Sequence, residues 1–194
     1  MSPTHRLVLK VARTIHVYLT LFGLVLILFF AVTGFMLNHE SWFALDAPHT
    51  RTVNGKLSTP ILDSVDRLTV VEELRRDFGA VGAMDSFDEE EESLRIVFKR
   101  PGTRIETTIQ RADGKTELTF EVSGVVGIMT DLHRGKATGR AWSLVIDGVC
   151  VIMLIISFTG LILWSSLRSR GKLGVFAMSM GLLVAVGVYW RFVP

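Results

Sequence analysis

The chain has 194 residues, of which 49% are hydrophobic, and its mean hydropathy of +0.41 favours membrane segments beside one modest soluble domain. A formal net charge of +2, without a Lys/Arg tract interleaved with aromatic residues, argues against nucleic-acid binding. The single cysteine, Cys150, excludes an intrachain disulfide. No phosphate-binding loop, HExxH pattern or Ser-His-Asp set is recognisable, so hydrolysis and phosphoryl transfer have no support in the sequence.

Three uncharged runs predict transmembrane helices. They cover 21 residues at 17–37, 20 residues at 148–167 and 18 residues at 173–190. At about 1.5 Å per residue, such helices approach or exceed the roughly 30 Å of a hydrocarbon core. The basic segment ahead of the first run is also typical of a cleaved signal peptide. That run is longer than a signal sequence needs, however, and no small-residue cleavage site follows it.

The bases that flank these runs predict their orientation. Six Lys and Arg and no acid lie at the N-terminus and in the loop 168–172, namely Arg6, Lys10, Arg13, Arg168, Arg170 and Lys172. Such segments usually face the cytoplasm. The connecting segment 38–141 has 14 Lys and Arg against 18 Asp and Glu, a net charge of −4. We therefore expect this segment and the C-terminus on the other side of the membrane.

The first half of the connecting segment is predicted to hold one helix. Residues 38–60 contain Pro and Asn-Gly signals with weak periodicity, which is typical of an irregular linker or a short edge strand. Thr69 and Glu72 form a capping-box signature, and apolar residues at helical spacing overlap it. We expect a helix over 69–78 that ends at Gly79.

The second half is predicted to form strands. Apolar and polar residues alternate at 94–98, 105–109 and 118–122, and a less regular candidate strand lies at 80–87. Asp113-Gly114 is a strong hairpin signal between two of these strands. The fold class is therefore an α+β membrane protein, with an antiparallel sheet and one helix between the first two spans. The acidic run 88–92 is interpreted as a solvated loop.

Histidines at the ends of the membrane segments are the candidate functional residues. His16 lies at the inner end of the first span, His39 lies at its outer end, and His133 ends a predicted amphipathic helix over 124–133. Imidazoles in such positions can ligate haem iron. His16 and His39 are separated by about 35 Å of helix, so they cannot share one iron. Within one protomer the possible bis-His site is His39 with His133, and His16 would need another partner.

Other uses of the outer histidines remain open. A divalent metal could be held by the pair with a third ligand from Glu40, His49 or Asp131. Alternatively, both histidines are interfacial polar residues bonded to headgroups or backbone. Three bases near His133 are expected at headgroup level, where they could contact lipid phosphates or the propionates of a cofactor: Arg134, Lys136 and Arg140.

Two Thr-Gly pairs recur in similar apolar surroundings, Thr33-Gly34 in AVTGFML and Thr159-Gly160 in SFTGLIL. Small residues of this kind let two helices approach closely or leave space beside a flat ligand. Close helix packing is the ordinary interpretation.

The segments ARTIHVYLTLFGLVLILFFAVTGFMLNHE and DLHRGKATGRAWSLVIDGVCVIMLIISFTGLILW resemble the two membrane blocks of PepSY-associated transmembrane proteins. The region between them is similar to a PepSY module. The most specific part is LHRGK..G..W...ID followed by S.TGL.LW, and the resemblance covers nearly the whole chain apart from the third span. His16, His39 and His133 match the family's histidines, and both Thr-Gly pairs match its helix motifs.

The resemblance implies a protein of the bacterial inner membrane with a periplasmic PepSY domain, and its larger relatives are haem-containing reductases of ferric siderophores. This chain is shorter, with fewer spans and histidines. The expected segments are a cytoplasmic N-terminus (1–14), transmembrane helix 1 (15–37), the periplasmic domain (38–141), transmembrane helix 2 (142–167), a cytoplasmic loop (168–172), transmembrane helix 3 (173–191) and a periplasmic tail (192–194).

Two functions are consistent with these expectations. The first is a component or accessory with haem b that carries electrons in periplasmic redox chemistry or ferric-siderophore uptake. It would need a membrane or periplasmic redox partner protein, because no flavin or nicotinamide motif is present. The alternative is a non-catalytic, membrane-anchored PepSY module that binds or regulates a partner protein.

Overall fold

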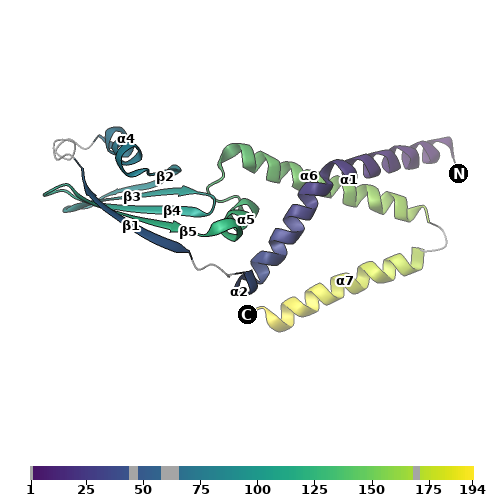
Figure 1. Cartoon of the computed structure of the whole chain (residues 1–194). Coiled ribbons are helices and arrows are strands. Elements are labelled where there is room, and N and C mark those ends of the chain that lie inside the picture. Colours follow the sequence, from purple (N-terminus) through teal and green to yellow (C-terminus); the bar gives the residue numbers. More distant parts are fainter. Residues whose placement is uncertain (1, 44–47, 58–65, 168–170) are drawn as a thin grey trace. The chain divides into compact units, whose positions relative to one another are not determined.

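The computed structural model describes residues 2–43, 48–57, 66–167 and 171–194. Along the chain the elements are α1 (Pro3–Asn38), α2 (Glu40–Phe43), β1 (His49–Lys56), α4 (Arg67–Phe78), β2 (Ala83–Glu89), β3 (Ser93–Arg100), β4 (Thr103–Gln110), β5 (Lys115–Val122), α5 (Gly124–Arg134), α6 (Gly139–Ser165) and α7 (Gly171–Phe192) (Figure 1).

The chain divides into two compact units. The sheet unit comprises Leu28–Ile146, and the helix unit comprises Met1–Ile27 with Asp147–Pro194. Two bases of the predicted cytoplasmic loop, Arg168 and Arg170, lie outside the described residues.

The sheet is antiparallel throughout, with the strand order β1-β5-β4-β3-β2. The predicted Asp-Gly hairpin between β4 and β5 is confirmed. Gly114 has a left-handed φ of 71°, and the Asp113 carboxylate accepts the amide of Lys115 at 2.9 Å. The candidate strand at 80–87 is shifted to β2, because Gly82 has a φ of 107° and the extended backbone starts after it.

The sequence of residues 38–60 is consistent with an irregular linker or a short edge strand, and strand β1 decides between them for residues 49–56. It pairs with β5 without a register shift, from His49 opposite Val122 to Lys56 opposite Lys115. Residues 49–56 therefore form an edge strand of the sheet, whereas 44–47 and 58–60 of the same segment lie outside the described residues.

Helix α4 lies over one face of the sheet (Figure 1). Its N-cap is Asp66 and not Thr69, because the Asp66 carboxylate accepts the amide of Leu68 at 3.2 Å and the Thr69 hydroxyl at 2.5 Å. The helix ends at Gly79, as predicted, where φ is 69°.

The core of the sheet unit lies between α4 and this face of the sheet. Eleven buried residues form it, namely Leu57, Val70, Val71, Leu74, Ala80, Leu94, Ile96, Phe98, Ile105, Ile109 and Leu118. The alternation of apolar and polar residues therefore predicts the buried face correctly. On the other face the strands carry charged side chains, among them the ion pair of Arg95 with Glu106.

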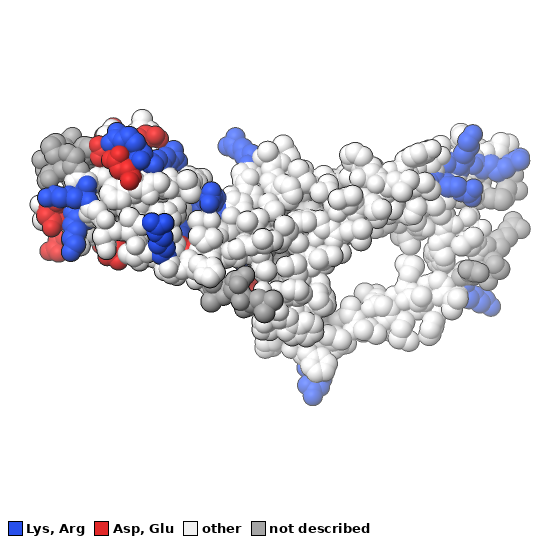
Figure 2. Space-filling model, viewed as in Figure 1, with Lys and Arg blue, Asp and Glu red and all other residues white. Residues whose placement is uncertain are grey.

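Three of the described helices are long and apolar enough to cross a membrane: α1 with 36 residues, α6 with 27 and α7 with 22. Helix α1 includes most of the predicted N-terminal segment 1–14. It starts early because Pro3 suits the first turn of a helix and the Ser2 hydroxyl accepts the amide of His5 at 3.3 Å. Charged side chains gather over the strands and at helix ends (Figure 2).

Candidate functional site

His133, near the end of α5, lies against one face of α1 in the sheet unit. Its Nδ1 atom is 2.7 Å from the Thr33 hydroxyl oxygen, and its ring centroid is 5.4 Å from that of Phe30. A Cβ atom built on Gly34 would lie 3.2 Å from Cε1 of His133. Phe30, Thr33 and Gly34 have the i, i+3, i+4 spacing of one helix face, and this face receives the imidazole.

The hydrogen bonds of Thr33 favour one tautomer of His133. The Thr33 hydroxyl is 2.7 Å from the carbonyl oxygen of Phe29, to which it donates its only proton. It therefore accepts a hydrogen bond from Nδ1–H of His133. In the neutral ring this leaves the Nε2 atom with a lone pair that can bind a metal.

His16 repeats this arrangement in the helix unit. Its Nδ1 atom donates to the carbonyl oxygen of Ile156 at 3.1 Å and to the Thr159 hydroxyl at 3.0 Å. The Thr159 hydroxyl in turn donates to the carbonyl oxygen of Ile155 at 2.7 Å. A Cβ atom on Gly160 would lie 3.4 Å from Cε1 of His16. Each Thr-Gly pair is thus the seat of one histidine from another helix, which we call a Thr-Gly seat.

His39 is not brought to His133. Its Nδ1 atom donates to the carbonyl oxygen of Phe35 at 3.0 Å, and its ring stacks on that of Phe35 with centroids 4.3 Å apart. Phe35 is two residues after Thr33, or about 200° around the helix. His39 and His133 therefore contact opposite faces of α1, and the bis-His pair expected within one protomer is not assembled.

The three bases near His133 have different surroundings. Arg134 forms an ion pair with Glu40 at 2.6 Å, so its charge is already partly compensated. Lys136 is exposed and lines a polar hollow beside the sheet. Arg140 is exposed at the second residue of α6.

The alternative metal site is likewise not assembled. Among the described residues, no group of three His, Cys, Asp or Glu lies close enough together to hold a metal ion. Glu40 is engaged by Arg134, and the Asp131 carboxylate accepts the backbone amide of Gly102 at 2.9 Å. A cavity of about 330 Å³ opens beside this ion pair, and its lining includes neither His39 nor His133.

The end of α5 is fixed from two sides. The Trp142 indole donates to the carbonyl oxygen of Leu132 at 2.8 Å, and its ring meets Phe29 edge-on at 6.1 Å. Asp131 ties the same helix to the hairpin between β3 and β4 through Gly102. Sequence reasoning missed these contacts, because no local pattern links residues that lie so far apart in the chain.

Haem fits these residues in one respect. The Nδ1–H group of His133 is held by Thr33, as ligating histidines usually are, and its Nε2 atom has no hydrogen-bond partner among the described residues. Gly34 leaves room beside the ring that a Cβ atom would fill. His133 would hold the group through one imidazole, since His39 is bonded to Phe35 and not to the residues around His133.

Comparison with protein families gives a match over nearly the whole chain. The family model described as Putative PepSY_TM-like matches residues 8–194, which include the three histidines, both Thr-Gly seats and the third span. Searches of curated proteins and of solved structures returned no significant match.

Proposed function

Because the chain belongs to the PepSY_TM-like family, we propose that this membrane-associated protein is an electron-transfer component or accessory that contains haem b. It would act in the bacterial inner membrane, in periplasmic redox chemistry or ferric-siderophore uptake. The bases that flank the spans support a cytoplasmic N-terminus, with the sheet and the C-terminus in the periplasm.

One observation carries this proposal. His16 and His133 each donate Nδ1–H to a threonine hydroxyl of another helix, and neither Nε2 atom has a hydrogen-bond partner among the described residues. Histidines that ligate metals are commonly oriented by such a bond, which fixes the tautomer and raises the basicity of the ligating nitrogen.

The residues around His133 have separate roles in this proposal. His133 would hold haem there, and the bound group would supply one-electron redox chemistry. Thr33 holds the imidazole in one orientation, and Gly34 leaves space beside it. Lys136 and Arg140 supply positive charge for propionates. The electron donor would come from a partner protein.

Absorption spectroscopy tests the proposal. The full chain is produced in haem-replete cells, purified in a mild detergent, and its oxidised and reduced spectra are recorded with haem quantification. We expect sharp reduced bands that His133→Ala abolishes and that His49→Ala, which removes an exposed histidine of β1, leaves unchanged. Thr33→Val should retain haem and shift its midpoint potential, because it removes only the acceptor of Nδ1–H.

A colourless wild-type protein would contradict the haem proposal, provided that it is folded and comes from cells that load other haem proteins. Equal haem content in His133→Ala and wild type would contradict the assignment of this ligand.

A second candidate function is a non-catalytic module that binds a partner protein. It is favoured by strand β1, which among the described residues pairs only with β5 and so leaves one edge open to an added strand. A cleft of about 540 Å³ beside this edge is lined by Val53, Phe78, Phe120 and Val122, among others. Under this function Val122→Asp should abolish partner crosslinking in cells, whereas His133→Ala should preserve it.

A further inference from the structure

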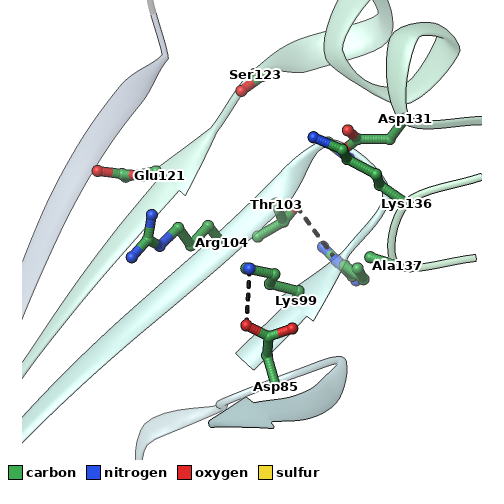
Figure 3. Close-up of a pocket in the computed structure, with 11 residues that line it drawn as sticks. Asp85, Lys99, Thr103, Arg104, Glu121, Ser123, Asp131, Lys136 and Ala137 are labelled. Atoms are coloured by element: carbon green, nitrogen blue, oxygen red, sulfur yellow. Dashed lines mark hydrogen bonds and ion pairs between the residues drawn. The ribbon is translucent and has the colours of Figure 1, made fainter. Parts of the chain in front are cut away.

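The end of the sheet next to α5 is hollowed and carries a concentration of bases. The hollow has a volume of about 410 Å³ and lies where the hairpin between β3 and β4 meets the loop that follows α5. Four of its lining residues are basic, namely Lys99, Arg100, Arg104 and Lys136, and three are acidic, namely Asp85, Glu121 and Asp131. We call it the basic hollow. Lys99 and Arg104 from the strands lie across it from Lys136 (Figure 3).

Two of these bases already have carboxylate partners. Lys99 Nζ is 2.7 Å from the Asp85 carboxylate, which also lines the hollow (Figure 3). Arg104 is 3.2 Å from Glu106, a carboxylate that also pairs with Arg95. Their charges are therefore compensated, at least in part, without a ligand.

The other two bases have no carboxylate within ion-pair distance among the described residues. Arg100 donates through Nε to the Thr103 hydroxyl at 3.3 Å, which leaves the outer nitrogens of its guanidinium available. Asp131, which also lines the hollow, uses one carboxylate oxygen to accept the Gly102 amide. Arg100, Lys136 and the Thr103 hydroxyl thus supply donors around one space.

The backbone of the loop is held in an unusual conformation beside these donors. Ala137, which lines the hollow next to Lys136, has a left-handed φ of 57°, between Gly135 at 67° and Gly139 at 76°. An alanine rarely adopts this conformation, and strain of this kind is concentrated at functional positions. The conformation turns the loop sharply between α5 and α6.

The sequence next to the hollow predicts a position near lipid headgroups. Lys136 is three residues before α6, whose Trp142 donates to Leu132 in the last turn of α5. Tryptophan indoles favour the interface between water and hydrocarbon. Phosphate is the anion found at that depth, and its oxygens suit a guanidinium, an ammonium and a hydroxyl together.

We propose that the basic hollow is a phosphate-binding site that takes the phosphodiester of an anionic lipid headgroup between Arg100 and Lys136. The same chemistry would bind free phosphate, so the test must separate these two sources. The site involves none of the three candidate histidines and shares only Lys136 with the proposed haem contacts, whereas Arg100 belongs to the hollow alone.

Isothermal titration of the full chain in a maltoside detergent tests this site. The probes are short-chain phosphatidylglycerol, short-chain phosphatidylcholine and inorganic phosphate. We expect Arg100→Gln and Lys136→Gln each to weaken phosphatidylglycerol binding at least tenfold. Both side chains are exposed, so the melting temperature should not change. The matched control is Lys115→Gln, which removes an exposed base at the far end of β5 and should bind like wild type.

The three probes distinguish a lipid phosphodiester from free phosphate as the ligand of the basic hollow. Phosphatidylglycerol binding that exceeds the binding of inorganic phosphate assigns the site to lipid, and equal or tighter binding of inorganic phosphate assigns it to the free anion. Binding that survives in both hollow variants would overturn the proposal, as would an equal loss in Lys115→Gln, which would indicate general charge attraction. Arg100→Lys retains the charge and should recover part of the affinity.

Discussion

The sheet unit and the helix unit bury their side chains to different extents. The sheet unit has a core of eleven buried residues between α4 and the strands. In the described part of the helix unit four residues are buried, namely Ala12, Gly23, Val149 and Thr159, and α7 buries none. Burial from water stabilises the first unit, whereas lipid is as apolar as the helix surfaces. The packing of the helix unit must therefore depend on close approach of helices at small residues and on hydrogen bonds between them.

The strongest test of this comparison is a substitution that creates a cavity in the core of the sheet unit. Phe98 is fully buried in the core. Phe98→Ala should lower the free energy of unfolding of this unit by about 3 to 5 kcal/mol, because it removes buried apolar area and leaves a cavity. Denaturant unfolding followed by circular dichroism measures the loss. Leu68→Ala, at an exposed position of α4, should cost less than about 0.5 kcal/mol, and an equal loss in both would contradict the assigned core.

The second test adds bulk where two membrane helices approach closely. A Cβ atom on Gly23 would lie 2.9 Å from Cγ2 of Ile152, so α1 and α6 must separate to accept a side chain. Gly23→Leu should destabilise the helix unit by about 1 to 3 kcal/mol. Titration with a denaturing detergent measures this change. The control is Gly148→Leu, because no atom lies within 4 Å of a Cβ atom there; a stable Gly23→Leu would refute the contact.

A smaller effect is expected from one hydrogen bond between membrane helices. Thr159→Val keeps the shape of the side chain and removes the hydroxyl that accepts Nδ1–H of His16. The loss should be about 0.6 kcal/mol and at most about 1.7 kcal/mol, as for other hydrogen bonds within membranes. The same detergent titration applies. Ser157→Ala removes a hydroxyl bonded only within α6 and should have no effect, so similar losses in both variants would argue against the seat.

The smallest effect concerns pH and the cap of α4. Hydrogen bonds from the Thr69 hydroxyl and the Leu68 amide lower the pKa of Asp66 below 3.8, its ordinary value. The stabilisation by this carboxylate is therefore complete above that value and is lost as pH falls through the lower pKa of the folded protein. Melting temperatures at decreasing pH should fall less steeply in Asp66→Asn, which cannot titrate but can still cap. Parallel pH profiles would contradict the role of Asp66.

The features that sequence alone predicts are those with a local cause. The three spans follow from uncharged length, the β4–β5 hairpin from Asp113-Gly114, and the end of α4 from Gly79. The cap was misassigned to Thr69 because Asp66 is an equally good capping residue three positions earlier. The sequence does not distinguish strand β1 from a linker, because its polar residues show little alternation and its partner β5 comes much later in the chain.

The candidate site was predicted only in part for a related reason. The histidines and the Thr-Gly pairs are recognisable as separate motifs, but their pairing depends on which helix packs on which. Thr33 meets His133 across 100 residues of sequence, and His16 meets Thr159 across 143. The position of His39 had a usable signal. At about 100° per residue, Phe35, on which His39 stacks, lies on a different face of α1 from Thr33.

The pairing of the first strand with the last has a consequence for biogenesis. The edge of β5 that receives β1 is complete only when Val122 has been synthesised, 66 residues after Lys56. At roughly 5 to 20 residues per second this delay is about 3 to 13 s, during which β1 has no partner. Its sequence, HTRTVNGK, contains one large aliphatic residue and two permanent positive charges, so the waiting segment has little tendency to aggregate.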